Sequence, residues 1–104
     1  MKIDHIAIQV DDIYEACGWY GSLFGAKTLY HDDSWAVLEF DNVKLALTLA
    51  NTHPPHVAVA VNPQKWPNLE FKQHRDGSNY HYLTDPWGNC LELIDYGRNT
   101  GENP

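Results

Sequence analysis

The chain has 104 residues, of which 43% are hydrophobic, with four Trp and six Tyr, so it is long enough for one domain with a core of its own. Its net charge is −7 and its basic residues are scattered, which argues against nucleic acid and against an anionic membrane surface as partners. The absence of a long apolar run and of a signal-peptide pattern predicts a cytoplasmic protein. The two cysteines, Cys17 and Cys90, are expected to be free thiols.

The chain opens with a predicted strand followed by a predicted helix. Residues 3–10 alternate as in a half-buried strand, with His5 on one face and Ile6, Ile8 and Val10 on the other. Asp12 and Glu15 have the spacing of a capping box, and Gly25 is the expected end of the helix. The apolar residues at helical spacing predict a buried stripe of Ile13, Ala16, Cys17, Tyr20 and Phe24.

Three strands are predicted next, over residues 27–31, 34–40 and 43–49. Asp32-Asp33 and Asp41-Asn42 supply the turns between them, the second of hairpin length. The order of elements in the first half is therefore β-α-β-β-β.

The pattern then restarts after Thr52-His53-Pro54-Pro55, which is a linker because its prolines cannot continue a central strand. His56-Val57-Ala58-Val59-Ala60-Val61 is similar to the stretch that begins at His5, with a second His in register 51 residues later. Trp66-Pro67 predicts only a short helical turn, or none, where the first half has its helix. Strands are expected near residues 71–75, 79–84 and 89–96, with a tight turn at 85–89.

These similarities predict a duplicated βαβββ module. The last strand, Cys90-Leu91-Glu92-Leu93-Ile94, corresponds to Lys44-Leu45-Ala46-Leu47-Thr48 at an offset of 46 residues. We predict an α+β fold with a mixed sheet in a single domain over residues 1–104. Module one covers residues 1–51, module two covers 55–97, and 98–104 form a C-terminal tail.

A duplication predicts a metal site. Matching strand positions face each other across a pseudo-twofold axis, so His5 would face His56 and Ala46 would face Glu92 in a shared cleft. Two imidazoles and a carboxylate can bind a divalent transition metal and leave positions open for substrate. The alternative is that each His is a hydrogen-bonded strand residue and that Glu92 is a solvent-facing residue of a half-exposed strand. The pattern leaves both interpretations open.

Several further side chains are candidates for lining the same pocket. Lys44, Thr48 and Cys90 share the strand parity of Ala46 and Glu92. One parity of residues 79–82 must also face the cleft, and the sequence does not say which, so the remaining candidates are Tyr80, His81 and Tyr82. His31 and His74 stand at strand ends and are expected to be exposed. No residue is assigned a catalytic role.

These features together resemble a known group of proteins. The helix end Trp19-Tyr20-Gly21-Ser22-Leu23-Phe24-Gly25, the restart at His56 and above all Asp85-Pro86-Trp87-Gly88-Asn89-Cys90-Leu91-Glu92 resemble the vicinal-oxygen-chelate superfamily of glyoxalases, bleomycin-resistance proteins and extradiol dioxygenases. The resemblance implies paired modules that form a cup-shaped sheet around a metal, with helices on its convex face, and a homodimer. It places metal ligands at His5, His56 and Glu92. Glyoxalase I enzymes have a fourth ligand where this chain has Ala46, which argues against glyoxalase I activity.

We therefore expect a metal-dependent enzyme that acts on a small oxygen-rich molecule, by lyase, dioxygenase, isomerase or transferase chemistry, with Fe, Mn, Ni or Zn. The alternative is a non-catalytic small-molecule binding protein of the bleomycin-resistance type, which needs no metal.

Overall fold

A computed structural model describes residues 1–97, and the tail predicted over 98–104 lies outside the described residues. The chain divides into two compact units. We call residues His5–His56 the helical unit, and Met1–Asp4 together with the chain from Val57 onward the C-terminal unit. The first four residues thus group with the second half of the chain.

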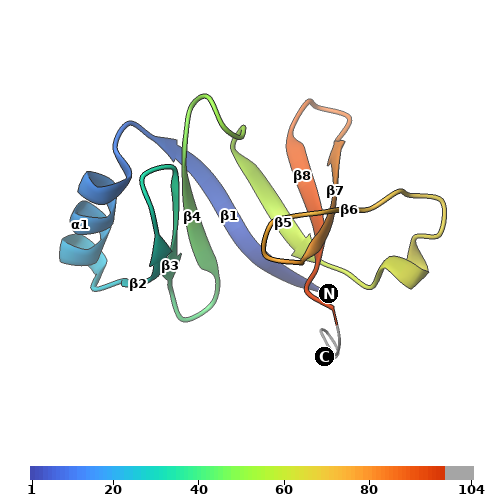
Figure 1. Cartoon of the computed structure of the whole chain (residues 1–104), viewed down its shortest axis with the longest axis horizontal. Coiled ribbons are helices and arrows are strands. Elements are labelled where there is room, and N and C mark those ends of the chain that lie inside the picture. Colours follow the sequence, from blue (N-terminus) through green and yellow to red (C-terminus); the bar gives the residue numbers. More distant parts are fainter. Residues whose placement is uncertain (98–104) are drawn as a thin grey trace. The chain divides into compact units, whose positions relative to one another are not determined.

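The helical unit contains one α-helix and four strands (Figure 1). The helix α1 (Ile13–Phe24) has Asp12 as its N-cap, whose side chain accepts a hydrogen bond from the Glu15 backbone N–H at 2.9 Å. It ends at Gly25, whose φ of 69° is the left-handed conformation that glycine adopts without strain. Both helix ends are therefore where the sequence predicts them.

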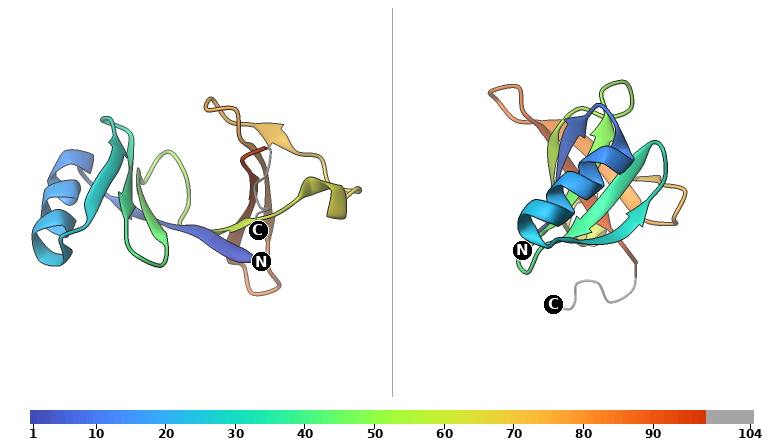
Figure 2. Two further views of the ribbon diagram at one scale, coloured as in Figure 1. Left: turned by 90° about the horizontal axis from the view of Figure 1, so that it is seen from below. Right: turned by 90° about the vertical axis from the view of Figure 1, so that its left-hand side faces the viewer.

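The strands of the helical unit lie in the order β2-β3-β4-β1. β1 (Lys2–Val10) runs parallel to β4 (Lys44–Leu49), while β3 (Trp35–Glu39) is antiparallel to β4 and to β2 (Lys27–His31). α1 packs against β2, β3 and β4, and Figure 2 shows it lying along one face of these strands. Its buried side joins a core cluster of Ile13, Ala36, Leu38 and Leu47.

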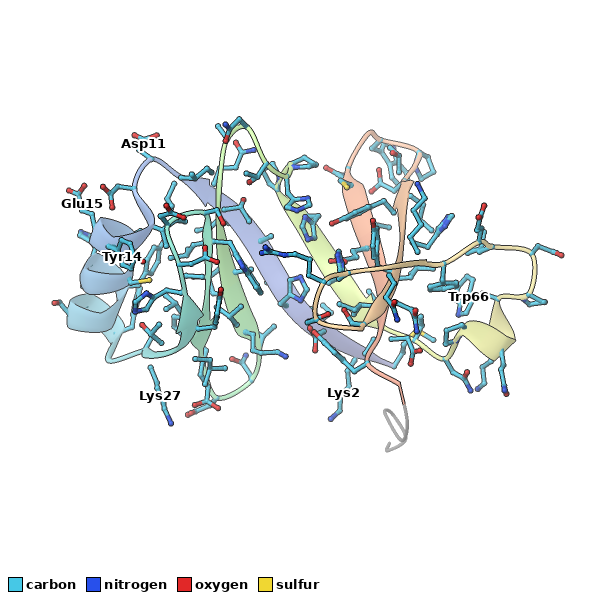
Figure 3. All side chains as sticks on the ribbon, in the orientation of Figure 1. Lys2, Asp11, Tyr14, Glu15, Lys27 and Trp66 are labelled. Carbon is cyan, nitrogen blue, oxygen red and sulfur yellow. The ribbon has the colours of Figure 1, made fainter. Side chains whose placement is uncertain are left out.

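One part of the predicted helix stripe is wrong. Ile13 is buried, and Ala16, Cys17 and Tyr20 pack against the core, but Phe24 is 58% exposed. Phe24 is the last residue of the helix, and its ring contacts Tyr20 and Phe40 at centroid distances of 6.2 and 5.8 Å. The helix ends before its last turn can be covered by the sheet. Figure 3 labels Tyr14 and Glu15, which lie on the exposed side of α1.

The C-terminal unit contains no α-helix within its described residues. β5 (His56–Ala60) leads into a single 3₁₀ turn, η1 (Pro63–Lys65), which has Asn62 as its N-cap and is followed by Trp66 (Figure 3). The predicted loss of the second helix is thus confirmed. The strand order is β5-β8-β7-β6, where β8 spans Cys90–Asp95, β7 spans Asn79–Thr84 and β6 is reduced to Lys72–Gln73.

The first strand contributes to both units. Its first residues belong to the C-terminal unit, where Asp4 Oδ2 accepts a 2.6 Å hydrogen bond from the Tyr96 hydroxyl. From His5 onward the same strand belongs to the helical unit. The α+β class, the mixed strand directions and the β-α-β-β-β order of the first half are confirmed. Within residues 1–97, no helix has the length and apolar character needed to cross a membrane.

Candidate functional site

In the helical unit, one face of β1 and β4 carries four of the ten predicted site residues. The parallel register pairs His5 with Lys44, Ala7 with Ala46, and Gln9 with Thr48. Paired residues of neighbouring strands point to the same face, so Lys44, Ala46 and Thr48 share the face of His5. Ala46 and Thr48 are buried, while Lys44 and His5 are partly exposed.

His5 and His56 lie next to each other. Their ring centroids are 5.6 Å apart with an edge-to-face angle of 74°. His56 is only 7% exposed, and its Nδ1 lies 2.8 Å from the Pro54 carbonyl oxygen. A carbonyl oxygen can only accept, so Nδ1 carries the proton and the neutral ring has its lone pair on Nε2. This is the arrangement of a metal-binding imidazole whose other nitrogen is held by the backbone.

The linker before β5 is fixed from β1. The Gln9 side-chain amide donates hydrogen bonds to the carbonyl oxygens of His53, at 2.8 Å, and of Ala50, at 3.4 Å. Pro54-Pro55 then keeps the chain extended up to His56. The His53 ring is exposed and lies 6.4 Å from the His56 ring, centroid to centroid. The orientation of His56 is therefore set by its own linker.

Glu92 belongs to the C-terminal unit, at the middle of β8. It is 2% exposed, although a carboxylate is costly to bury. The antiparallel register places Tyr82 opposite Glu92, Thr84 opposite Cys90 and Tyr80 opposite Ile94. Strand alternation then puts Cys90, Glu92, Tyr80 and Tyr82 on one face.

A hydrogen bond from His74 contributes to holding Glu92. His74 Nε2 lies 2.8 Å from Glu92 Oε2, and an ionised carboxylate can only accept, so Nε2–H is the donor. The His74 ring stacks on Tyr80, with centroids 3.8 Å apart and planes within 13°. The sequence predicts an exposed His74, and this is wrong, because its side chain is 29% exposed and bonded.

A signal for His74 is present in the sequence. Asp76-Gly77 is a typical hairpin dipeptide, and it connects β6 to β7. Gln73 pairs with Asn79, so these two residues point to the same face of the sheet. The next residue, His74, points to the opposite face, which is the face of Tyr80.

His81 lies on the other face of β7. Its Nδ1 donates a 2.8 Å hydrogen bond to the Glu70 carbonyl oxygen, and its ring contacts Phe71. Among residues 79–82, the structure thus groups Tyr80 and Tyr82 with Glu92 and directs His81 away from it.

Burial and the nearby carboxylate change the acidity of two groups on the Glu92 face. Burial, with the charge of Glu92 as a smaller cause, raises the pKa of Tyr82 far above its usual value. The same two causes raise the pKa of the Cys90 thiol. At neutral pH both side chains are therefore protonated: Tyr82 is a hydrogen-bond donor and Cys90 is a weak nucleophile.

The turn before β8 is rigid. Asp85 Oδ1 accepts hydrogen bonds from the Trp87 and Asn89 backbone N–H groups, both at 2.9 Å, and the Asn89 amide donates to Asp85 Oδ2 at 2.9 Å. Gly88 has a φ of 90°, as the turn requires. The Asp-Pro-x-Gly-Asn run thus sets the start of the strand that carries Glu92.

Solved structures resemble this chain over nearly its whole length. A methylmalonyl-CoA epimerase from Streptomyces coelicolor, in complex with 2-nitronate-propionyl-CoA, gives a TM-score of 0.71 at 16% identity, covering 94% of this chain and 96% of that one. A hypothetical protein from Bacillus halodurans C-125 gives 0.70 at 20% identity, covering 93% and 95%. A glyoxalase/bleomycin resistance protein/dioxygenase superfamily member from Vibrio splendidus 12B01 gives 0.67 at 14% identity, covering 86% and 95%. At these low identities, the structural similarity shows the fold alone.

A comparison with curated proteins finds no match. The family model of the glyoxalases matches residues 2–74, a range that includes His5, His56 and His74 and ends before Glu92. This match covers more than half of the sequence, and the fold agrees with it. The chain belongs to the Glyoxalase/Bleomycin resistance protein/Dioxygenase superfamily.

Proposed function

We propose that this protein is a metal-dependent enzyme that acts on a small oxygen-rich molecule, and that His5, His56 and Glu92 together hold one divalent ion. The observation that carries the proposal is the histidine pair. Its two members come from matching strands of the sequence repeat, their rings lie 5.6 Å apart, and the backbone fixes the tautomer of His56. The proposal requires the two units to bring Glu92 to this pair.

The donor chemistry fits a transition metal. Two imidazole nitrogens and one carboxylate oxygen suit Fe²⁺, Mn²⁺, Ni²⁺ or Zn²⁺ and leave positions for substrate oxygens. Ala46 offers no ligand atom at the position where a fourth protein ligand would stand, which favours chemistry other than that of glyoxalase I. A bound ion would supply Lewis-acid stabilisation of an oxyanion or enolate formed on the substrate.

The remaining residues of the site have separable roles in this proposal. Tyr82 stays protonated because of burial and Glu92, so its hydroxyl can donate a hydrogen bond to a substrate oxygen. Cys90 keeps its proton as well, which disfavours a covalent intermediate on its sulfur. Lys44 shares the face of His5, so it stays a candidate for lining the pocket.

The substrate is best sought among molecules with two neighbouring oxygens. One structural neighbour is named methylmalonyl-CoA epimerase, so acyl-CoA thioesters that also carry a carboxylate belong in the panel alongside 2-oxo acids and catechols. Isomerase, lyase, dioxygenase and transferase reactions all fit the proposed site. We also propose a homodimer, which light scattering of the purified protein tests directly.

The first experiment is elemental analysis of protein purified without chelator or affinity tag. The test variant is His56→Ala/Glu92→Ala. The matched control is His31→Ala, which removes an exposed histidine at the end of β2. We expect metal near one ion per chain in the wild type and in the control, and its loss in the double variant. Added metal at 100 times its Kd should raise the free energy of unfolding of the wild type by about 2.7 kcal/mol.

The opposite result is equally clear. If the wild type takes up none of the four metals and gains no stability from them, the metal-dependent enzyme is ruled out. A binding protein of the bleomycin-resistance type then becomes the better hypothesis, and binding of cationic aromatic drugs becomes the next measurement.

A further inference from the structure

We propose that His74 is a positioning residue for the metal site: it orients the Glu92 carboxylate by holding one of its two oxygens. This inference rests on the proposed function and adds to it a residue outside the ligand set. His74 Nε2–H donates to Glu92 Oε2 at 2.8 Å. A carboxylate held at Oε2 has a defined direction for Oε1, and such outer partners are known to tune metal ligands.

The His74 ring is itself held in place. It stacks on Tyr80 at 3.8 Å, and Tyr80 is fixed in the sheet by its register with Ile94 on β8, two residues from Glu92. The ring therefore packs against a side chain of β7, and the carboxylate extends from β8, the strand paired with β7. Little side-chain entropy remains to be lost when the hydrogen bond forms.

The backbone of His74 is equally constrained. Its N–H donates to the Ser78 carbonyl oxygen at 2.8 Å, and its own carbonyl oxygen accepts from the Gly77 N–H at 3.0 Å. Gly77 has the positive φ that this turn needs, and Ser78 is 3% exposed and bonded to Asp76. A surface histidine with no role beyond solubility would not need a closed turn, a stacked ring and a buried acceptor.

If His74 had only a structural role, its removal would have different effects from those expected of a positioning residue. If His74 only compensates for burial of Glu92, its removal lowers stability and leaves the metal affinity of the folded protein unchanged. If it orients the carboxylate, its removal weakens metal binding even where the protein stays folded. Gln at this position keeps a side-chain N–H donor and should restore part of the affinity.

The experiment is calorimetric titration of the full chain with Zn²⁺ and Mn²⁺, for wild type, His74→Ala, His74→Gln and the control His81→Ala. The control removes His81, a histidine of β7 whose side chain points to the face of the sheet opposite to that of Glu92. We expect His74→Ala to lose about 10- to 100-fold in metal affinity. His74→Gln should lose less, and His81→Ala should stay within about threefold of the wild type.

A second measurement uses only the wild type, so it does not depend on the variants folding. In ¹⁵N NMR of the Zn²⁺ form, His5 and His56 should show nitrogens shifted by coordination, whereas His74 Nε2 should keep its proton and show no such shift. A coordination shift at His74, or an unchanged affinity in folded His74→Ala, overturns the positioning role while the metal site stands. Absence of metal binding in the wild type overturns both proposals.

Discussion

The two units start from the same repeated sequence pattern and become stable by different means. The helical unit covers its sheet with α1 and buries a cluster of Ile13, Leu38, Leu47 and Ala36. In the C-terminal unit, η1 is a single turn, and polar Ser78 and Glu92 are buried beside Leu93 and Ile94. An apolar cluster under a helix therefore distinguishes the helical unit, while both units also bury polar residues, Thr48 and His56 in one and Ser78 and Glu92 in the other. The repeat with only a 3₁₀ turn is the one that carries the acidic residue of the proposed site.

The largest expected effect on stability concerns the apolar core of the helical unit. Leu47→Ala removes a side chain with no exposed surface from the core under α1, so it should lower the free energy of unfolding by about 2–5 kcal/mol. Urea unfolding measures the loss. The control Leu29→Ala truncates a leucine that is 45% exposed on β2 and should cost much less. Equal losses would contradict the assignment of the core.

A smaller effect on stability is expected for a buried polar residue of the C-terminal unit. The Ser78 hydroxyl donates a 2.6 Å hydrogen bond to Asp76 Oδ1, and the residue is 3% exposed. Ser78→Ala should lower the free energy of unfolding by about 1–2 kcal/mol, because the hydrogen bond to a charged acceptor is lost. Ser22→Ala on the exposed side of α1 is the control and should change stability little. No difference between the two serines would show that this loop does not stabilise its unit.

The two helix starts give a direct comparison at corresponding places of the repeat. Asp12 accepts from the Glu15 N–H at 2.9 Å, and Asn62 accepts from the Gln64 N–H at 3.0 Å. Asp12→Ala should cost about 1 kcal/mol, since it uncaps a three-turn helix. Asn62→Ala should cost less, because a single 3₁₀ turn has little cooperative structure to lose. Thermal unfolding of both variants side by side tests the order, and a larger loss at Asn62 would reverse it.

Acid sensitivity should be shared by both units. Hydrogen bonds from Tyr30 and Ser34 lower the pKa of Asp32, and those from Asn89 lower the pKa of Asp85. A carboxyl with a depressed folded pKa adds stability above its unfolded pKa of about 3.9, and this is lost as pH falls through the folded pKa. Melting temperatures at pH 7 and pH 3 should therefore differ less in Asp32→Asn and Asp85→Asn than in the wild type. An unchanged difference would contradict the role of these turns.

The sequence predicted the elements well where local chemistry decides them. Asp12 and Gly25 mark the two ends of α1, and Trp66-Pro67 signals the missing second helix, because caps and prolines act within a few residues. The predicted burial of Phe24 was wrong for a non-local reason. Whether this side chain is covered depends on where the sheet ends, and helical spacing does not contain that information.

The candidate site was predictable only in part. Strand parity grouped His5 with Lys44, and Glu92 with Cys90, as the registers have them. His74 was missed because its hydrogen bond to Glu92 spans 18 residues, and because His74 follows a strand, β6, of only two residues, which gives little periodicity to read. The choice between Tyr80 and His81 needed the register of β7, which the turns did not fix tightly enough.

The hydrogen bond between Asp4 and Tyr96 has a consequence for how the protein is made on the ribosome. It joins residues 92 positions apart, at the two ends of the described chain. During synthesis, which proceeds at roughly 5–20 residues per second, the whole of His5–His56 is made before Tyr96. Asp4 must wait several seconds more for Tyr96. Over that interval this hydrogen bond cannot form, so the pace of translation through the second half of the chain sets how soon the start of β1 is joined to Tyr96.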